Sequence, residues 1–192
     1  SVTVPQGATS KSFTITTKAV TSSQTTTITA TRGTVSLQQT LTVTPITIQN
    51  VQLNASYVTG GTSLSGVVHL AARAPSGGYV VNLTSSYPSV AKTPVSVTVP
   101  SGATSATFTV TTYPVPQTYF VTITATHGLS SASASLQVVP PEVSTFRLST
   151  NRTRGGNSLT GTVTLNGKAP TGGIVVHISA NPNLASPATS VV

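Results

Sequence analysis

Cysteine, methionine and tryptophan are all absent from this chain of 192 residues. Without cysteine there is no disulfide, no thiolate metal site and no thiol nucleophile. No apolar run approaches the roughly 20 residues that a membrane-spanning helix needs, so we expect no membrane span. The lack of cysteine does not identify a compartment, because many bacterial surface proteins also lack it.

Acidic side chains are nearly absent as well, since Glu142 is the only acid against nine Lys and Arg. Catalysis by paired carboxylates needs two acids, and a Ser-His-Asp arrangement needs an acid that nothing places beside a histidine. The histidines fit no metal-ligand spacing. We interpret them as surface residues, with His69 and His177 at outward strand positions and His127 in a turn. We expect no catalytic, cofactor or metal site, and no enzymatic activity.

The formal charge of +8 is the most unusual property of the composition. A basic excess can indicate binding to nucleic acid or another polyanion. Here the basic residues are dispersed, and aromatic residues suited to stacking on bases are few and unclustered. We therefore interpret the charge as a solvated background and predict that nucleic acid is not a partner.

What the chain does contain is an internal repeat with an offset of 95 residues. Residues 96–112 read SVTVPSGATSATFTVTT, and residues 1–17 read SVTVPQGATSKSFTITT. The same offset relates the glycine pair that begins at Gly60 to the pair that begins at Gly155. A unit of this length is much longer than a solenoid repeat and matches one small all-β domain.

Within one unit, apolar residues alternate with Ser and Thr at the two-residue period of a half-buried strand. Threonine is itself a good strand former, so the abundant hydroxyl residues indicate folded β structure. We predict seven strands in residues 46–140, the first at residues 46–54. The inward-facing residues of the other six are predicted as Leu64, Gly66, Val68 and Leu70; Tyr79, Val81 and Leu83; Val95, Val97 and Val99; Ala106, Phe108 and Val110; Tyr119, Val121, Ile123 and Ala125; and Ala134, Leu136 and Val138.

Glycine and proline mark the turns between these strands. The stretch from Pro100 to Gly102 suits a type I turn, with proline at its second position and glycine at its fourth. The turn at Pro75 is expected to use the two residues in the same way, and further turns are expected at Gly60 and Gly128. Seven short strands joined by such turns predict an immunoglobulin-like β-sandwich.

The repeat predicts three domain segments. Residues 1–45 form the C-terminal half of a repeat, residues 46–140 a complete repeat, and residues 141–192 the N-terminal half of the next. Val192 has the phase of Val2, so the chain is expected to be a window of about two periods that is cut within a domain. Proline at both joins predicts a semi-rigid connection. With no methionine or signal pattern at its start, the chain is not expected to begin at the translated N-terminus.

Neither half-repeat can bury its apolar face alone. The residues expected to be exposed are Val2, Val4, Phe13, Ile15 and Ile28 at one end and Leu159, Val163, Leu165, Val175 and Ile178 at the other. Because the halves are complementary in phase, one chain can complete the next, and a head-to-tail contact that does not close builds a filament. Exchanged subunits and a covalent, longer repetitive polypeptide both stay open. We favour the covalent version, because it avoids the cost of association.

Three motifs connect the chain with a known family. They are Gly60-Gly61, Ala74-Pro75-x-Gly77-Gly78, and Val99-Pro100-x-Gly102-Ala103-Thr104-x-x-x-Phe108. With these motifs the chain resembles the tandem bacterial immunoglobulin-like repeats (Big/invasin type) of large extracellular proteins. The resemblance implies tandem sandwiches of about 95 residues, a location outside the cell or at its surface, and a role as stalk, adhesin or fibre module.

From these observations we expect a non-catalytic structural repeat of an extracellular filament, sheath or cell-surface stalk. Its expected partners are other copies of itself, head to tail or side by side, and polysaccharide of the matrix or cell surface. The alternative is an adhesin or carbohydrate-binding module whose loops around Tyr87, Tyr113 and Tyr119 recognise a glycan. These tyrosines are not repeated at the equivalent positions of the other copies, which disfavours the alternative weakly.

Overall fold

The structure is a computed structural model that describes residues 1–185. Val192, whose phase suggested a two-period window, lies outside the described residues. The chain divides into two compact units, Ser1–Ile46 and Thr47–Val192. The described residues contain strands and turns and no helix, so the fold is all-β as predicted. The three predicted segments 1–45, 46–140 and 141–192 stay a prediction.

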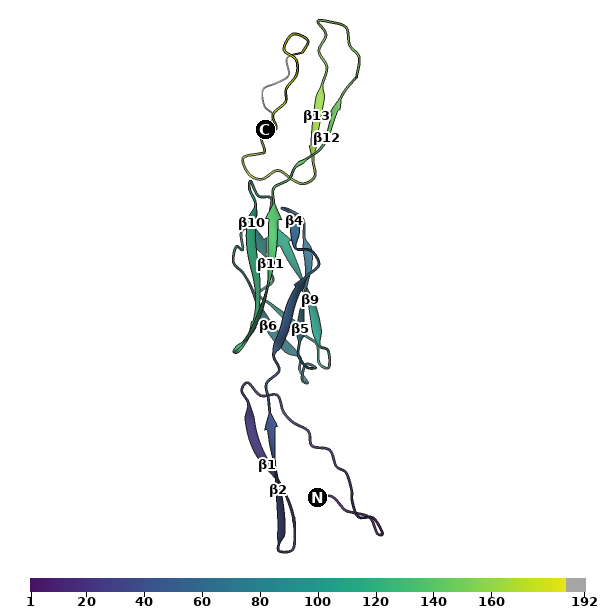
Figure 1. Cartoon of the computed structure of the whole chain (residues 1–192), viewed down its shortest axis with the longest axis vertical. Helices are drawn as coiled ribbons and strands as arrows, with labels where there is room; N and C mark the ends of the chain where they lie inside the picture. The colour runs from purple at the N-terminus through teal and green to yellow at the C-terminus, as the bar shows by residue number, and fades with distance from the viewer. Residues whose placement is uncertain (186–192) are drawn as a thin grey trace. The chain divides into compact units, whose positions relative to one another are not determined.

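The first unit contains one β-hairpin. Strand β1 (Gln24–Arg32) pairs antiparallel with β2 (Val35–Val43) along their full lengths (Figure 1). The two-residue connection begins with Gly33 at φ +60°, which suits a type II′ turn with glycine at its first central position. No strand is formed by residues 1–23.

The second unit begins with two sheets that pack as a sandwich (Figure 1). One sheet has the order β4-β11-β10-β6-β8, and the other has the order β3-β5-β9-β7. The bounds of these strands are β3 Ile48–Leu53, β4 Tyr57–Thr59, β5 Leu64–Leu70, β6 Tyr79–Ser85, β7 Ala91–Lys92, β8 Ser96–Val99, β9 Ser105–Thr112, β10 Tyr119–His127 and β11 Ser130–Val139. After the sandwich, β12 (Val143–Leu148) and β13 (Gly161–Leu165) form a separate antiparallel pair.

The core of the sandwich lies between these two sheets. Its largest fully buried side chains are Val68, Val81, Val99, Val110, Val121, Ile123, Leu136 and Val138. They come from both sheets at alternate strand positions, as the two-residue period predicted. Each sheet therefore buries one face against the other, and removal of this apolar surface from water drives folding.

Most predicted inward positions are buried, but Val97 in β8 and Ala134 in the middle of β11 are only half-buried, and further exceptions lie at strand ends. Val95 was predicted to face inward but is 86% exposed, because β8 begins only at Ser96. Ala106 and Tyr119, at the starts of β9 and β10, are half-buried. The first strand runs over Ile48–Leu53 rather than residues 46–54.

Two short strands were not predicted. Strand β4 adds to β11 in the only parallel pairing of the described residues, and β7 adds two residues to the end of β9. Segments this short show no period of their own, so only their neighbours define them.

The proline turns form, but in a different register from the prediction. The amide of Ala103 donates to the carbonyl of Pro100, so Pro100 is the first residue of the turn and Gly102 the third. Gly102 has φ +77°, which a type II turn requires at that position and a type I turn does not allow. The predicted type I turn is therefore wrong. The turn at Pro75 has the same register, with Gly77 at φ +93°.

Phe108 packs across the sheet on Gly66, its directly paired residue on β5. A Cβ at position 66 would overlap the ring of Phe108, so only glycine fits there. The ring itself is 6% exposed. This contact explains why a glycine occupies the interior of a strand, where it otherwise costs stability.

The exposure predicted for the half-repeats is correct in part. Most of the ten predicted residues are exposed, including Phe13 at 60% and Leu159 at 40%. Ile28, Val163, Leu165 and Ile178 are half-buried instead.

Truncation of Phe108 tests the core assignment. We predict that Phe108→Ala lowers the free energy of unfolding by about 3–5 kcal/mol, because it removes a buried ring and leaves a cavity over Gly66. Urea unfolding of the full chain, followed by circular dichroism, measures the loss. Phe120→Ala is the control, since Phe120 is 74% exposed and should change stability by less than about 0.5 kcal/mol. A loss below about 1 kcal/mol for Phe108→Ala would contradict the packing.

The turn register is tested at Gly102. We predict that Gly102→Ala costs about 1–2 kcal/mol, because an L residue with a Cβ is strained at positive φ. No other atom lies within 4 Å of the new Cβ, so the strain would come from the backbone alone. Ser101→Ala, one residue earlier in the same turn, is the matched control. Equal stability of the two variants would contradict this register and support the type I turn instead.

Candidate functional site

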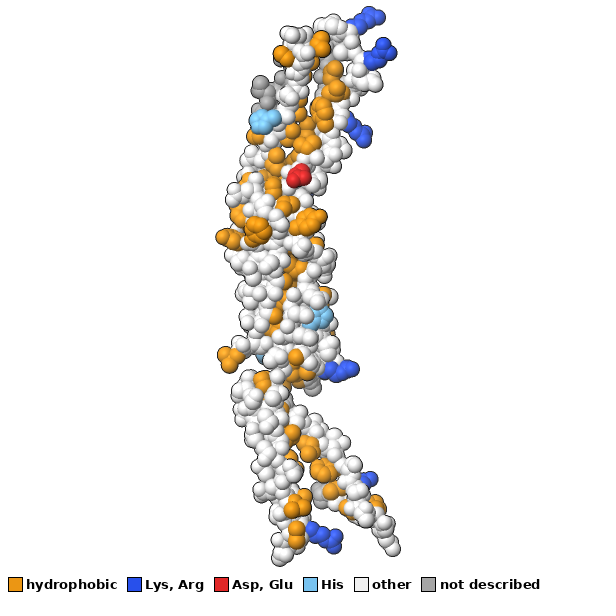
Figure 2. All heavy atoms as spheres, in the orientation of Figure 1, with side chains coloured by type: hydrophobic (Ala, Val, Ile, Leu, Met, Phe, Trp, Pro, Cys, Tyr) orange, Lys and Arg blue, Asp and Glu red, His pale blue; other side chains and the backbone are white. Residues whose placement is uncertain are grey.

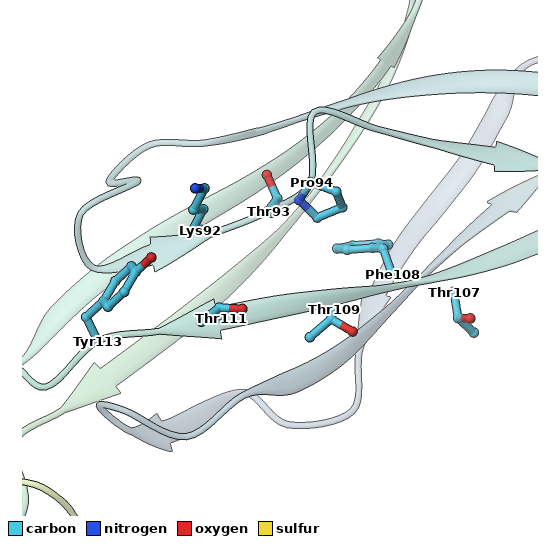
Figure 3. A pocket seen from close by; sticks show the side chains of 8 residues that line it. All are labelled: Lys92, Thr93, Pro94, Thr107, Phe108, Thr109, Thr111 and Tyr113. Carbon is cyan, nitrogen blue, oxygen red and sulfur yellow. The ribbon is translucent and has the colours of Figure 1, made fainter.

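An open groove with a volume of about 640 Å³ lies along the edge of β9 in the sandwich. Because β7 covers only the last residues of β9, the earlier part of this edge has no strand beside it. Figure 3 shows Lys92 and Tyr113 toward one end of the groove and Thr107 toward the other. The lining residues are Lys92, Thr93, Pro94, Thr107, Phe108, Thr109, Thr111 and Tyr113.

The lining of this groove offers hydroxyl groups, one amine and one phenol. Thr107, Thr109 and Thr111 alternate along β9, so their side chains share one face. No carboxyl group lines the groove. A general acid–base pair of carboxylates is therefore not available there, and the groups present are those that hydrogen-bond a neutral, hydroxylated ligand.

The three loop tyrosines that the sequence singled out do not form one site. The rings of Tyr87 and Tyr119 meet edge to face, with centroids 6.1 Å apart. Tyr113 lies in the groove beside Lys92 instead. Its amide donates to the carbonyl of Val90, so the start of this loop is held to the segment before β7.

His127 differs from the prediction, because it ends β10 and is only half-exposed. Its ring stacks on Tyr79 with centroids 4.0 Å apart. Its Nδ1 lies 2.6 Å from the carbonyl oxygen of Val80. A carbonyl can only accept, so Nδ1 carries the proton and donates. Burial raises the pKa of the Tyr79 phenol. This pair fastens the end of β10 to β6.

The other candidate residues stay apart. His69 is half-buried on β5 and His177 is exposed, outside any strand. Glu142 is exposed, and its amide donates to the side-chain oxygen of Asn166. Among residues 1–185, no three side chains of the His, Cys, Asp and Glu types lie close enough to hold a metal ion.

The basic residues are less evenly spread than the sequence suggested. Arg147, Arg152 and Arg154 all belong to β12 and the loop after it, and all are exposed. Figure 2 shows Lys and Arg side chains otherwise separated from one another. Arg73 is held to the sandwich, because its guanidinium donates to the carbonyl of Gly102. The three arginines are close to one another in the sequence, so their clustering could have been predicted from the sequence alone.

No known family model matches the chain, and no curated protein matches it either. In the part of the chain that the structure describes, no helix is long and apolar enough to cross a membrane.

Binding to a polyanion tests whether the basic residues form a specific site. We predict that heparin binds weakly and that the affinity falls steeply with salt, because exposed and dispersed charges are screened. Isothermal titration at several NaCl concentrations measures this, with neutral dextran as the control ligand. Tight binding that persists at high salt would contradict the prediction and indicate a specific site, with the arginines of the β12 loop as the first residues to replace.

Proposed function

We propose that the chain is a non-catalytic structural repeat of an extracellular filament, sheath or cell-surface stalk. In this proposal it consists of tandem immunoglobulin-like sandwiches of about 95 residues that assemble head to tail. Its partners are other copies of itself and, secondarily, surface or matrix polysaccharide. The observation that carries the proposal is that turns at equivalent positions of the sequence repeat have the same backbone geometry.

The turns supply that observation. In one turn the amide of Thr62 donates to the carbonyl of Thr59. In its counterpart 95 positions later, the amide of Asn157 donates to the carbonyl of Arg154. The third residue of each has positive φ, +91° at Gly61 and +83° at Gly156. The proline turns at Pro5, Pro75, Pro100 and Pro170 likewise share one register, with a glycine at positive φ in third place. Such agreement supports several copies of one unit.

The strand order supports the immunoglobulin-like type. Strands β3, β5 and β9 share one sheet, and β6, β10 and β11 share the other. This matches strands A, B and E against C, F and G in an immunoglobulin sandwich. The unit departs from that pattern at β7 and β8, where the chain visits the β9 edge before it returns to the β6 edge.

The chemistry of the surface also favours a structural role. The outward strand positions carry mainly Thr and Ser, and a single carboxylate occurs in the sequence. Catalysis usually depends on a pair of carboxylates, a metal ion or a nucleophile with its base. A sequence with a single acidic residue cannot supply the pair of carboxylates. We therefore propose that the chain works by packing and assembly.

A second candidate function is carbohydrate recognition, as an adhesin or binding module. It is favoured by the hydroxyl-lined groove that ends at Tyr113 and by the exposed ring of Tyr87, because sugars stack on aromatic rings in binding sites. Tyr87 is 51% exposed and packs on Tyr119 without burying its outer face. The two functions make different predictions for the isolated chain.

We predict that the 192-residue chain associates as its concentration rises and forms elongated particles. Sedimentation velocity over a range of concentrations and negative-stain electron microscopy measure this. Association should strengthen with salt, because copies with the same charge repel one another. A chain that stays monomeric at high concentration and binds glycans on an array would contradict the structural proposal and favour the second candidate.

A further inference from the structure

We propose that the outer face of the five-stranded sheet binds an extended, uncharged glycan of the cellulose type, in which the sugars are joined through equatorial bonds. Two aromatic rings, Tyr57 and Phe120, stack on the sugars, and Gln137 lies between them. The inference rests on the polysaccharide partner in the proposed function and gives that partner a site and a chemical class. All three residues belong to the sandwich itself, so the site needs nothing from the segments before or after it.

The strand register places the two rings in one row across the sheet. Tyr57 on β4 lies directly opposite Gln137 on β11, and Gln137 lies directly opposite Phe120 on β10 (Figure 1). Directly opposed residues of neighbouring strands share one face of a sheet. The neighbours of Gln137 in the chain, Leu136 and Val138, are buried in the core, so the row faces outward. Tyr57 and Phe120 are therefore two strand spacings apart, or about 10 Å.

The row is also the most exposed aromatic surface of the molecule. Tyr57 and Phe120 are 67% and 74% exposed, more than any other aromatic side chain of residues 1–185. Gln137 between them is half-buried. Single exposed rings are common on protein surfaces, but two rings in one row with a covered side chain between them form a continuous patch that indicates a binding surface.

A cellulose-type glycan fits this row because of the way its sugars present their faces. The axial C–H groups of each sugar ring form an apolar face that stacks on the negative face of an aromatic ring. Successive sugars are turned over relative to one another, so the same face returns at every second sugar, a repeat about equal to two strand spacings. Tyr57 and Phe120 therefore meet the first and third of three consecutive sugars.

Hydrogen-bonding groups lie between and beside the rings. Within the described residues the side-chain amide of Gln137 has no hydrogen-bond partner, so its donors and its acceptor are available to the middle sugar. Thr122 and Ser135, the next outward pair along β10 and β11, are directly opposed and exposed. Their hydroxyl groups can donate to and accept from the hydroxyls at the rim of the glycan.

The charge of this face favours an uncharged ligand. None of the five strands contains a Lys, Arg, Asp or Glu residue, although the chain as a whole has a formal charge of +8. An acidic polysaccharide therefore finds no cationic partner in these strands. A second copy of the chain, which carries the same net positive charge, finds no opposite charge to offset its repulsion. A neutral glycan meets neither obstacle.

Two glycans of the same sugar in different linkage test the ligand class. The full chain is titrated with cellohexaose and, as the matched control, with maltohexaose, whose axial links curve the chain and do not return the same face at this spacing. Two-dimensional amide NMR follows both titrations. We expect cellohexaose to bind at least about tenfold more tightly, because only it engages both rings. The largest shifts should occur at Tyr57, Gln137 and Phe120. Equal affinities, or no binding of cellohexaose, would overturn the inference.

Replacement of single rings tests the position of the site. Tyr57→Ala and Phe120→Ala should each weaken cellohexaose binding at least about fivefold, because each removes one stacked ring. Tyr57→Phe keeps the ring and should stay within about twofold of the original affinity. Tyr113→Ala is the matched control, because it removes the ring of the groove beside β9 on the other sheet and should leave the affinity unchanged. A loss with Tyr113→Ala alone would place the glycan in that groove and overturn the site.

Self-association separates this inference from the proposed structural function. In sedimentation velocity, Tyr57→Ala and Phe120→Ala should associate as the unsubstituted chain does. Variants that lose self-association and keep cellohexaose binding would show that this face is an interface between copies, which would overturn the glycan site. An unsubstituted chain that stays monomeric, but whose cellohexaose binding falls with both substitutions, would overturn the structural proposal and support the glycan site.

Discussion

The structure depends on the burial of two sheet faces against each other. A single sheet exposes one apolar face, and only a second sheet removes it from water. In the sandwich both faces are present, and Val68, Val110 and Ile123 have no exposed surface. With no disulfide and no metal cluster among the described residues, this burial has to stabilise the fold almost alone. The exposed hydrophobic residues outside the sandwich follow from the same requirement.

The contact of Phe108 with Gly66 shows how this burial defines a register. Gly66 has no side chain, so the far end of the Phe108 ring can occupy the space where its Cβ would lie. A shift of either strand would lose the ring's seat and turn the alternating side chains to the wrong face. The same pair of residue types recurs as Phe13 and Gly161, in segments that do not meet within one unit.

The surface is suited to such repetition. Threonine and serine on the outer faces keep the strands soluble without carboxylates, and threonine favours the extended backbone. A shared positive charge opposes indiscriminate association, so a chain of this kind can combine apolar contact sites with a repulsive background. The open groove at the edge of β9 has no role in the proposed structural function. Its hydroxyl lining is the basis of the second candidate function.

The sequence alone determined the all-β class, most core positions and the places of the turns, since the two-residue period and the conformations of proline and glycine are local properties. It could not show that Gly102 is third in its turn, because that depends on which carbonyl accepts the bond from Ala103. Strands β4 and β7 are equally invisible in the sequence, since they exist only through pairing with β11 and β9. The separation of Tyr113 from Tyr87 and Tyr119, and the proton on Nδ1 of His127, were likewise decided by tertiary structure. Except at the Gly102 turn, where the acceptor Pro100 is a near neighbour in the chain, the partner lies far away in the sequence, where no local preference reaches.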